Sequence, residues 1–177
     1  MTIFLQNNSN QKKRSLLSPS IKVLSVLQVD LNLLANRGKK VILIDVDNTI
    51  VGWHGSVVSN EIVNWFQKGK QLGFKFCLVS NTNKVNRLRS IAQQADIPYV
   101  RGLIKPSRSM FKKALALYDE QPQNAIMIGD QLFTDVLGAN RSQIDSIWVE
   151  PLTPKDFWST KISRLAERIV VRLFHKK

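Results

Sequence analysis

The sequence has a single cysteine, Cys77, among 177 residues, which excludes an intrachain disulfide and a zinc site built from cysteines. Cys77 lies within an apolar run at residues 74–79, so we interpret it as a buried packing residue. No run of about 18 apolar residues occurs, and the start has no basic region followed by an apolar core. We therefore expect neither a membrane-spanning helix nor a secretory signal, and the lack of a disulfide framework fits a reducing compartment.

Acidic residues are scarce at both ends of the chain, whose net charge is +13. Residues 1–40 contain seven Lys or Arg and one acid, residues 151–177 contain seven and two, and residues 41–150 contain twelve and ten. Two basic ends around a nearly balanced centre indicate an anionic partner, either a membrane or a nucleic acid, although the same charges could serve solubility alone.

The centre of the chain alternates predicted strands with predicted helices. Short apolar runs predict strands at residues 41–44, 74–79, 97–100, 124–128 and 146–149. Helices are expected from Ser59 to Gly73, after Asn83, from Pro106, and over residues 132–139. This alternation predicts an α/β fold with a Rossmann-like, doubly wound parallel sheet of about five strands.

The two ends are expected to flank this sheet. Residues 1–14 predict a disordered basic tail, with an organellar transit peptide left open. Residues 15–177 are expected to form a single domain, in which residues 15–40 are a partly helical packing segment ending at Gly38. Residues 156–174 predict a basic amphipathic helix, whose apolar stripe either packs on the sheet or lies on an anionic membrane.

Two carboxylates follow the first apolar strand. Asp45 and Asp47, with Thr49 after them, come directly after the run at residues 41–44. Parallel sheets hold their ligands at the carboxyl ends of the strands. Because two acids there are costly unless a cation or a reaction uses them, this stretch predicts an active site.

Three further motifs follow in order, at the ends of later strands or the start of a helix: Ser80-Asn81, Lys105-Pro106, and Gly129-Asp130 with Asp135 after it. Together, over residues 41–149, the motifs resemble those of the haloacid dehalogenase superfamily, most of whose members are magnesium-dependent phosphotransferases. The DVDNTI form and the short spacing resemble the YqeG-type group (subfamily IIIA), which includes phosphatidylglycerophosphate phosphatases.

This resemblance implies a role for each acid. Asp45 would attack phosphorus and form an aspartyl-phosphate, and Asp47, oriented by Thr49, would protonate the leaving oxygen. Asp45, the backbone carbonyl of Asp47, and Asp130 would bind Mg²⁺. Asp135 would be a further metal contact, or would cap a helix or brace Lys105.

The remaining motif residues are expected to bind the phosphoryl group. The hydroxyl of Ser80 and the ammonium of Lys105 would hold the phosphoryl oxygens, Lys105 by supplying positive charge. Asn81 would contact the substrate or only form a turn.

The spacing leaves no room for a lid domain, because about twelve residues separate Asp47 from the next helix and Lys105 follows Ser80 by only twenty-five positions. An open site suits a large or surface-bound phosphoester. Trp53 and His54, on the short loop beside the nucleophile, are expected to contact the substrate, with packing and surface exposure as the alternatives.

With the open site and the basic ends, the resemblance to the YqeG-type group implies a phosphatase that converts phosphatidylglycerophosphate to phosphatidylglycerol. We expect a phosphorylated anionic lipid as substrate and peripheral contact with the cytoplasmic face of an anionic membrane, or with a plastid or mitochondrial membrane. A phosphatase for a soluble or nucleic-acid phosphomonoester and a non-catalytic binding protein are the alternatives. No aromatic RNA-binding pattern occurs, so no nucleic-acid partner is expected.

Overall fold

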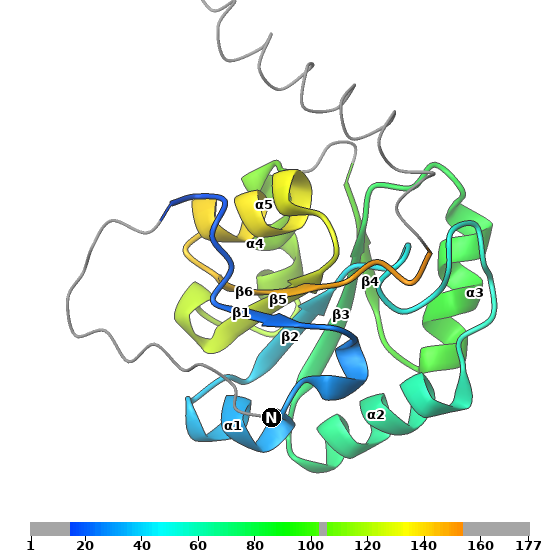
Figure 1. The fold of residues 1–177 in the computed structure, drawn as a ribbon, viewed down its shortest axis with the longest axis horizontal. Coiled ribbons are helices and arrows are strands. Elements are labelled where there is room, and N and C mark those ends of the chain that lie inside the picture. Colours follow the sequence, from blue (N-terminus) through cyan, green and yellow to red (C-terminus); the bar gives the residue numbers. More distant parts are fainter. Residues whose placement is uncertain (1–14, 103–105, 154–177) are drawn as a thin grey trace, which may run out of the picture.

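The protein is built around a six-stranded parallel sheet with the strand order β1-β6-β5-β2-β3-β4. The computed structural model describes residues 15–102 and 106–153. Its strands are β1 (Ile21–Val23), β2 (Val41–Ile44), β3 (Lys75–Ser80), β4 (Tyr99–Arg101), β5 (Ala125–Gly129) and β6 (Asp145–Val149). Figure 1 shows β2 and β3 in the middle of the fold. This sheet confirms the predicted α/β class.

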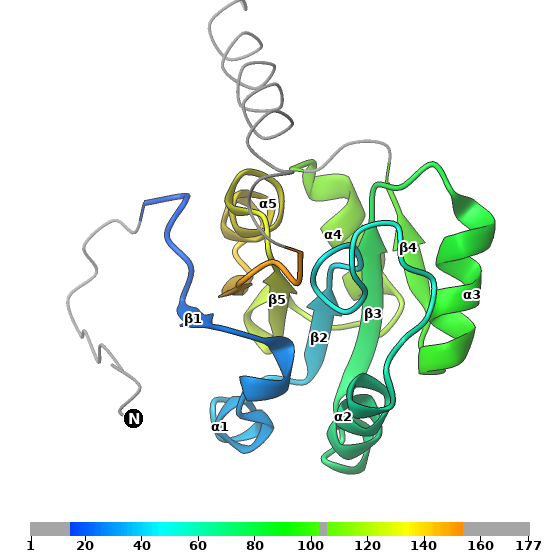
Figure 2. The same ribbon diagram turned by 45° about the vertical axis from the view of Figure 1, so that its right-hand side comes forward.

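Helices connect the strands and cover both faces of the sheet. They are α1 (Leu31–Asn36), α2 (Asn60–Gln71), α3 (Val85–Ala95), α4 (Arg108–Ala116) and α5 (Leu137–Arg141). Shorter helical turns are η1 (Val26–Gln28), η2 (Pro122–Asn124) and the π-helical η3 (Leu132–Val136). Figure 2 shows α4 and α5 on the opposite side of the sheet from α2.

Alternate residues of β2 divide the core into two layers. Ile42 and Ile44 pack with the buried side chains of α1, α2 and α3, whereas Val41 and Leu43 pack with those of α4 and α5. All four side chains are completely buried. A strand covered on both faces needs apolar residues at every position, which is why this run shows no polar alternation.

The packing segment before β2 contributes a strand that the sequence did not predict. β1 pairs in parallel with β6, with Ile21 opposite Ile147 and Val23 opposite Val149. This raises the strand number from the expected five to six. The segment is also partly helical, and Gly38 follows α1 in the left-handed region with φ +72°.

Several element boundaries differ from prediction, and two of the differences have a clear local reason. The strand expected at residues 97–100 begins at Tyr99, because the N–H of Ile97 still caps α3 and Pro98 has no N–H to donate. The helix expected from Pro106 begins at Arg108, after the N-cap Ser107. The helix expected over residues 132–139 is divided between η3 and α5.

The expected basic tail at residues 1–14 and the expected amphipathic helix at residues 156–174 lie outside the described residues. Among the residues that the structure does describe, no helix has the length and apolar character needed to cross a membrane.

Candidate active site

The site lies where the strand order of the sheet reverses. After β2 the chain continues to β3 and β4 on one side, whereas after β5 it continues to β6 on the other. Open α/β sheets bind ligands at the carboxyl ends of the strands beside such a point. Asp45 directly follows β2 and Asp130 directly follows β5, and the Asp45 N–H donates to the Ile128 carbonyl at 2.9 Å.

Three carboxylates meet at this point. Each of Asp45, Asp130 and Asp135 offers an oxygen, and these atoms lie within 4.8 Å of one another. The residues are only 5%, 5% and 1% exposed. Buried like charges repel and are costly to desolvate, and oxygen donors at this spacing suit a hard divalent cation such as Mg²⁺. The donor set therefore fits a metal ion.

Asp135 reaches the cluster from the first turn of η3. Its Oδ2 atom accepts a hydrogen bond from the Gln131 N–H at 3.1 Å, so the same carboxylate also caps this turn. Gly129 makes room for it, because a Cβ atom at that position would overlap the Asp135 carboxylate. The glycine of the last motif is therefore required by packing.

Two neighbours fix Asp130. Its carbonyl accepts a hydrogen bond from the indole Nε1–H of Trp148 at 2.7 Å, and its Oδ1 accepts one from the Thr49 hydroxyl at 3.4 Å. Thr49 is buried. The Thr49 hydroxyl thus contacts Asp130, whereas the family resemblance implies a contact with Asp47.

Asp47 stands apart from the acidic cluster and is held by Arg87 of α3. Arg87 Nη2 donates to Asp47 Oδ1 at 2.7 Å, and the two side chains are 11% and 20% exposed. The same guanidinium donates from Nε to the Gly55 carbonyl at 2.7 Å. Asn48, at φ +61°, bends the chain directly after Asp47. The Asp47 carboxylate is thus paired with Arg87, whereas the grouped carboxylates are those of Asp45, Asp130 and Asp135.

Two of the other predicted phosphoryl-binding residues come from the end of β3. Ser80 ends β3 and is buried, and its hydroxyl accepts a hydrogen bond from the Thr82 N–H at 3.2 Å. Asn81, the next residue, is exposed. Lys105 lies outside the described residues.

Trp53 and His54 lie on the flap, residues 51–59, which runs beside α3 (Figures 1 and 2). Their ring centroids are 4.8 Å apart. Trp53 is half-buried, its backbone N–H donates to Thr153 Oγ1 at 3.4 Å, and Thr153 donates to Asn48 Oδ1 at 2.8 Å. His54 is exposed. The loop after β6 therefore braces the flap from one side.

Contacts with α3 hold the flap from the other side. Gln94 accepts a hydrogen bond from the Val58 N–H at 3.0 Å and donates to the Ser56 carbonyl at 2.8 Å. Lys84 Nζ lies 3.4 Å from His54 Nδ1. The flap is thus a short, braced loop.

Sequence reasoning missed Lys84, Arg87 and Thr153 as neighbours of the site. Lys84 is exposed, Arg87 and Thr153 are half-buried, and none of the three belongs to a motif. Only the helical spacing of Lys84 and Arg87, three residues apart just after the Ser80 motif, could have suggested that they share a face toward the site.

Comparison with known proteins adds an independent line of evidence. The haloacid dehalogenase-like hydrolase family matches residues 12–143. The chain is 31% identical over 159 residues to the probable phosphatase YqeG of Bacillus subtilis strain 168, covering 90% of this chain and 92% of that protein. It is 28% identical over 87 residues to the glyceraldehyde 3-phosphate phosphatase of Pyrococcus abyssi, covering 45% of this chain and 37% of that protein.

Solved structures share the fold. An uncharacterized protein from Listeria monocytogenes superposes with a TM-score of 0.53 at 23% identity, covering 62% of this chain and 77% of that one. A predicted HAD-like family hydrolase from Porphyromonas gingivalis superposes with a TM-score of 0.51 at 14% identity, covering 72% and 98%. At these identities the likeness concerns the fold alone.

Proposed function

The chain belongs to the haloacid dehalogenase-like hydrolase family and is a phosphatase, and we propose that it hydrolyses a phosphomonoester with Mg²⁺ through an aspartyl-phosphate on Asp45. The buried cluster of Asp45, Asp130 and Asp135 carries this proposal, because its oxygens lie within 4.8 Å of one another and suit a cation. A bound metal ion would neutralise the repulsion between the carboxylates and the phosphate dianion.

The chemistry follows from the positions of the two motif acids. A carboxylate oxygen of Asp45 attacks phosphorus, the bond from phosphorus to the ester oxygen breaks, and Asp47 gives its proton to that oxygen. Asp47 then takes a proton from the water that hydrolyses the aspartyl-phosphate, which releases phosphate and restores Asp45. Ser80 and Lys105 hold the phosphoryl oxygens during both steps.

The substrate that we propose is phosphatidylglycerophosphate. The similarity to the probable phosphatase YqeG over 92% of that protein's length supports the phosphatase activity alone. The lipid substrate is supported by the short connection after Asp47, because only twelve residues separate Asp47 from α2 and leave the site open to a bulky substrate. The short flap excludes water poorly by itself, which suits a substrate whose own bulk covers the site.

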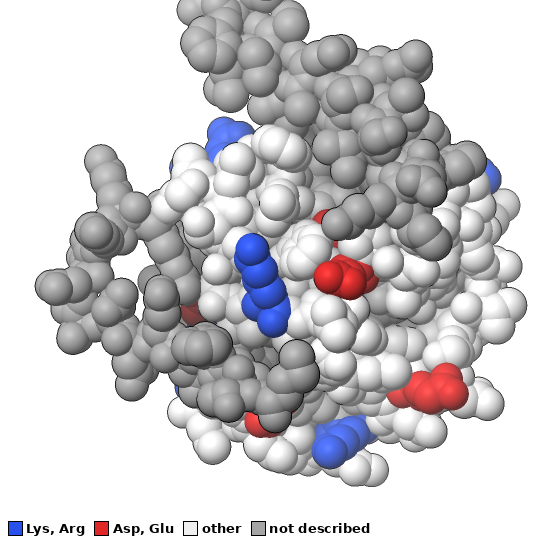
Figure 3. All heavy atoms as spheres, viewed as in Figure 1, with Lys and Arg blue, Asp and Glu red and all other residues white. Residues whose placement is uncertain are grey.

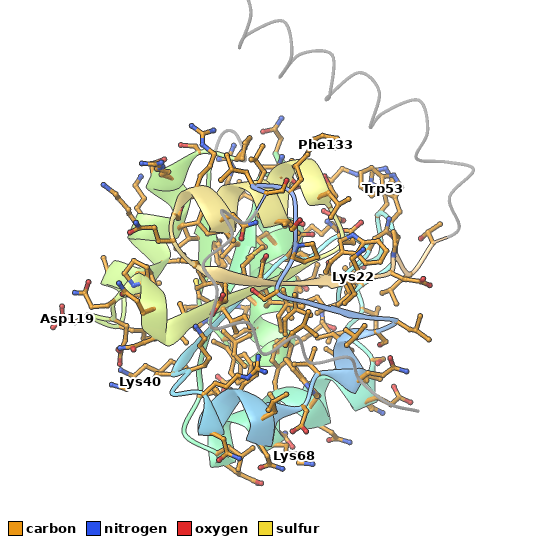
Figure 4. All side chains as sticks on the ribbon, turned by 60° about the vertical axis from the view of Figure 1, so that its left-hand side comes forward. Lys22, Lys40, Trp53, Lys68, Asp119 and Phe133 are labelled. Atoms are coloured by element: carbon orange, nitrogen blue, oxygen red, sulfur yellow. The ribbon has the colours of Figure 1, made fainter. Side chains whose placement is uncertain are left out.

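Apolar side chains near the site support contact with a lipid surface. The segments that follow β2, β5 and β6 expose Val57 (77%), Leu132 (36%) and Leu152 (49%). Trp53 and Phe133 are half-buried and lie toward the same end of the molecule in Figure 4. We propose peripheral binding at the cytoplasmic face of an anionic membrane, or at a plastid or mitochondrial membrane.

A soluble phosphoester is the second candidate. The match to a glyceraldehyde 3-phosphate phosphatase favours it, although that match covers only 45% of this chain. The two candidates make different predictions for substrate preference.

Turnover of matched substrates separates them. Phosphate release with Mg²⁺ is measured for phosphatidylglycerophosphate in mixed micelles, for glyceraldehyde 3-phosphate and for glycerol 3-phosphate. We expect kcat/KM for the lipid to exceed those for both soluble esters by about 100-fold, as expected when binding of remote substrate groups contributes to transition-state stabilisation. Equal or faster turnover of a soluble ester would overturn the lipid assignment and favour the second candidate.

A further inference from the structure

Two cations beside the site have no acidic partner within the part of the chain that the structure describes. Lys84 and Arg101 are both exposed, and no carboxylate pairs with either among residues 15–102 and 106–153. Arg101, at the end of β4, donates from Nε to the Thr82 carbonyl at 2.9 Å and from Nη2 to Asn83 Oδ1 at 3.3 Å. Arg101 therefore contacts the loop at residues 81–84, directly after Ser80, and Lys84 is the last residue of that loop.

The contacts of Arg87 show on which side of the reaction centre Lys84 lies. Lys84 and Arg87 are three residues apart and both reach the flap, Lys84 at His54 and Arg87 at Gly55. Arg87 also bonds Asp47, the acid that protonates the leaving oxygen. The shared face of these residues thus borders the leaving-group side, whereas the acidic cluster serves the transferred phosphoryl group.

His54 adds a further donor to this side. An ammonium can only donate, so His54 Nδ1 must accept from Lys84 Nζ at 3.4 Å, and the proton of a neutral ring is then on Nε2. His54 is held at φ +61° by the turn in which the Gly55 N–H donates to the Gly52 carbonyl at 2.8 Å. Lys84, His54 and Arg101 consequently present donors and no acceptor.

We propose that Lys84, His54 and Arg101 form a second anion site, which binds a phosphodiester carried by the leaving group of the substrate. This inference rests on the proposed function and specifies its substrate class. Cations without carboxylate partners beside an acidic reaction centre favour a substrate with two separate phosphates, because the acids repel an anion that is not held by donors of its own. The phosphodiester can belong to a lipid headgroup or to a soluble ester.

Two soluble esters with the same terminal phosphate test the second anion site. Glycerol 3-phosphate has no second anion, whereas glycerophosphoglycerophosphate carries a phosphodiester in its leaving group. We expect kcat/KM of the unmodified protein to be on the order of 10-fold or more higher for the diester-bearing ester, as charge-assisted hydrogen bonds contribute at that level. We expect this ratio to fall toward one in Lys84→Ala and in Arg101→Ala, and Lys84→Arg to retain most of it.

Arg89→Ala is the matched control, because Arg89 is exposed on the same helix, and it should keep the ratio. Melting temperatures establish that each variant is folded.

Equal turnover of the two esters by the unmodified protein, or an equal loss on both in Lys84→Ala, would overturn the second anion site and leave the phosphatase assignment standing. Turnover of neither ester nor of the lipid would overturn the proposed function as well. A preference for the lipid over its deacylated form would assign the site to a headgroup, and equal rates would assign it to a free phosphodiester.

Discussion

Arg87 connects the reaction centre to the flap through a single side chain. Its guanidinium bonds both Asp47, at 2.7 Å, and the Gly55 carbonyl, also at 2.7 Å. A planar guanidinium can hold two acceptors in fixed directions, whereas an ammonium is a point charge on a flexible stem. We therefore interpret Arg87 as a positioning residue for Asp47, the acid that we propose protonates the leaving oxygen.

Replacing Arg87 tests this role. We expect Arg87→Ala to lower kcat by about 10- to 100-fold with a smaller change in KM, because a misoriented acid loses part of the contribution of general acid catalysis. The kcat of Arg87→Lys should lie between those of Arg87→Ala and the unmodified protein, because lysine keeps the positive charge but cannot hold two acceptors in fixed directions. Steady-state kinetics on one substrate measure these values, with Arg89→Ala as the control. A kcat within twofold of the unmodified protein in Arg87→Ala would contradict the role.

Gly129 is the residue whose lack of a side chain permits the acidic cluster. We expect Gly129→Ala to destabilise the protein by about 1–3 kcal/mol, because overpacking a buried site costs this much. The displaced Asp135 carboxylate should also weaken the rise in melting temperature on adding Mg²⁺. Urea unfolding and thermal melts measure the two effects.

Gly52→Ala provides the control for Gly129→Ala. A Cβ atom at Gly52 would meet only Thr153 Oγ1 at 3.9 Å, an ordinary contact, so its stability should change by less than about 0.5 kcal/mol. Equal free energies of unfolding for the two variants would contradict the steric conflict between a Cβ atom at position 129 and the Asp135 carboxylate.

β3 illustrates which features of an element the sequence predicts. Its apolar run predicted a buried strand ending at a functional serine, and five of its six residues are buried. Burial of Cys77 on this strand raises the pKa of its thiol from 9.0 to about 12. Burial, with Cys77 nearby, also raises the pKa of Tyr118, whose hydroxyl bonds the Phe76 carbonyl, to about 12.

The raised pKa of Cys77 predicts a loss of stability in base. Above pH 9 the thiol ionises in the unfolded chain but not in the folded protein, so the unfolded state binds fewer protons and the free energy of unfolding falls as pH rises. We expect a loss of about 1 kcal/mol between pH 9 and 10. Urea unfolding at pH 8, 9 and 10 measures it, and Cys77→Ala, although less stable throughout, should show a shallower slope. Parallel curves would contradict the burial of this thiol.

Elements whose partners are distant in sequence were harder to predict. β1 has only three residues and is stabilised as a strand by pairing with β6, more than 120 residues away. The flap likewise depends on Lys84, Arg87 and Gln94, which no local pattern marks. The acids at strand ends were predictable because parallel topology brings the carboxyl ends of β2 and β5 together.

Most of the excess positive charge of the chain lies in its two ends. On the described surface, Lys and Arg side chains are scattered. In Figure 3 the coloured Lys and Arg side chains lie apart and do not form one continuous basic patch. Residues 1–40 and 151–177 together contain fourteen of the 26 basic residues. We therefore expect the ends, more than the face in Figure 3, to contribute to binding an anionic surface.

Vesicle binding tests this expectation. The full chain should sediment with phosphatidylglycerol vesicles and not with phosphatidylcholine vesicles, and 1 M salt should release it because the Debye length falls to about 3 Å. Equal binding to neutral vesicles, or binding that salt does not weaken, would contradict an electrostatic membrane contact.

The central claim is that Asp45 is the nucleophile of a metal-assisted phosphatase. The most direct measurement is phosphate release from phosphatidylglycerophosphate in Mg²⁺ by the unmodified protein and by Asp45→Asn, with melting temperatures to verify folding. We predict that Asp45→Asn lowers kcat by about 1,000-fold or more, because loss of a covalent nucleophile removes the aspartyl-phosphate route. A folded Asp45→Asn protein that kept more than a tenth of the activity would contradict the claim.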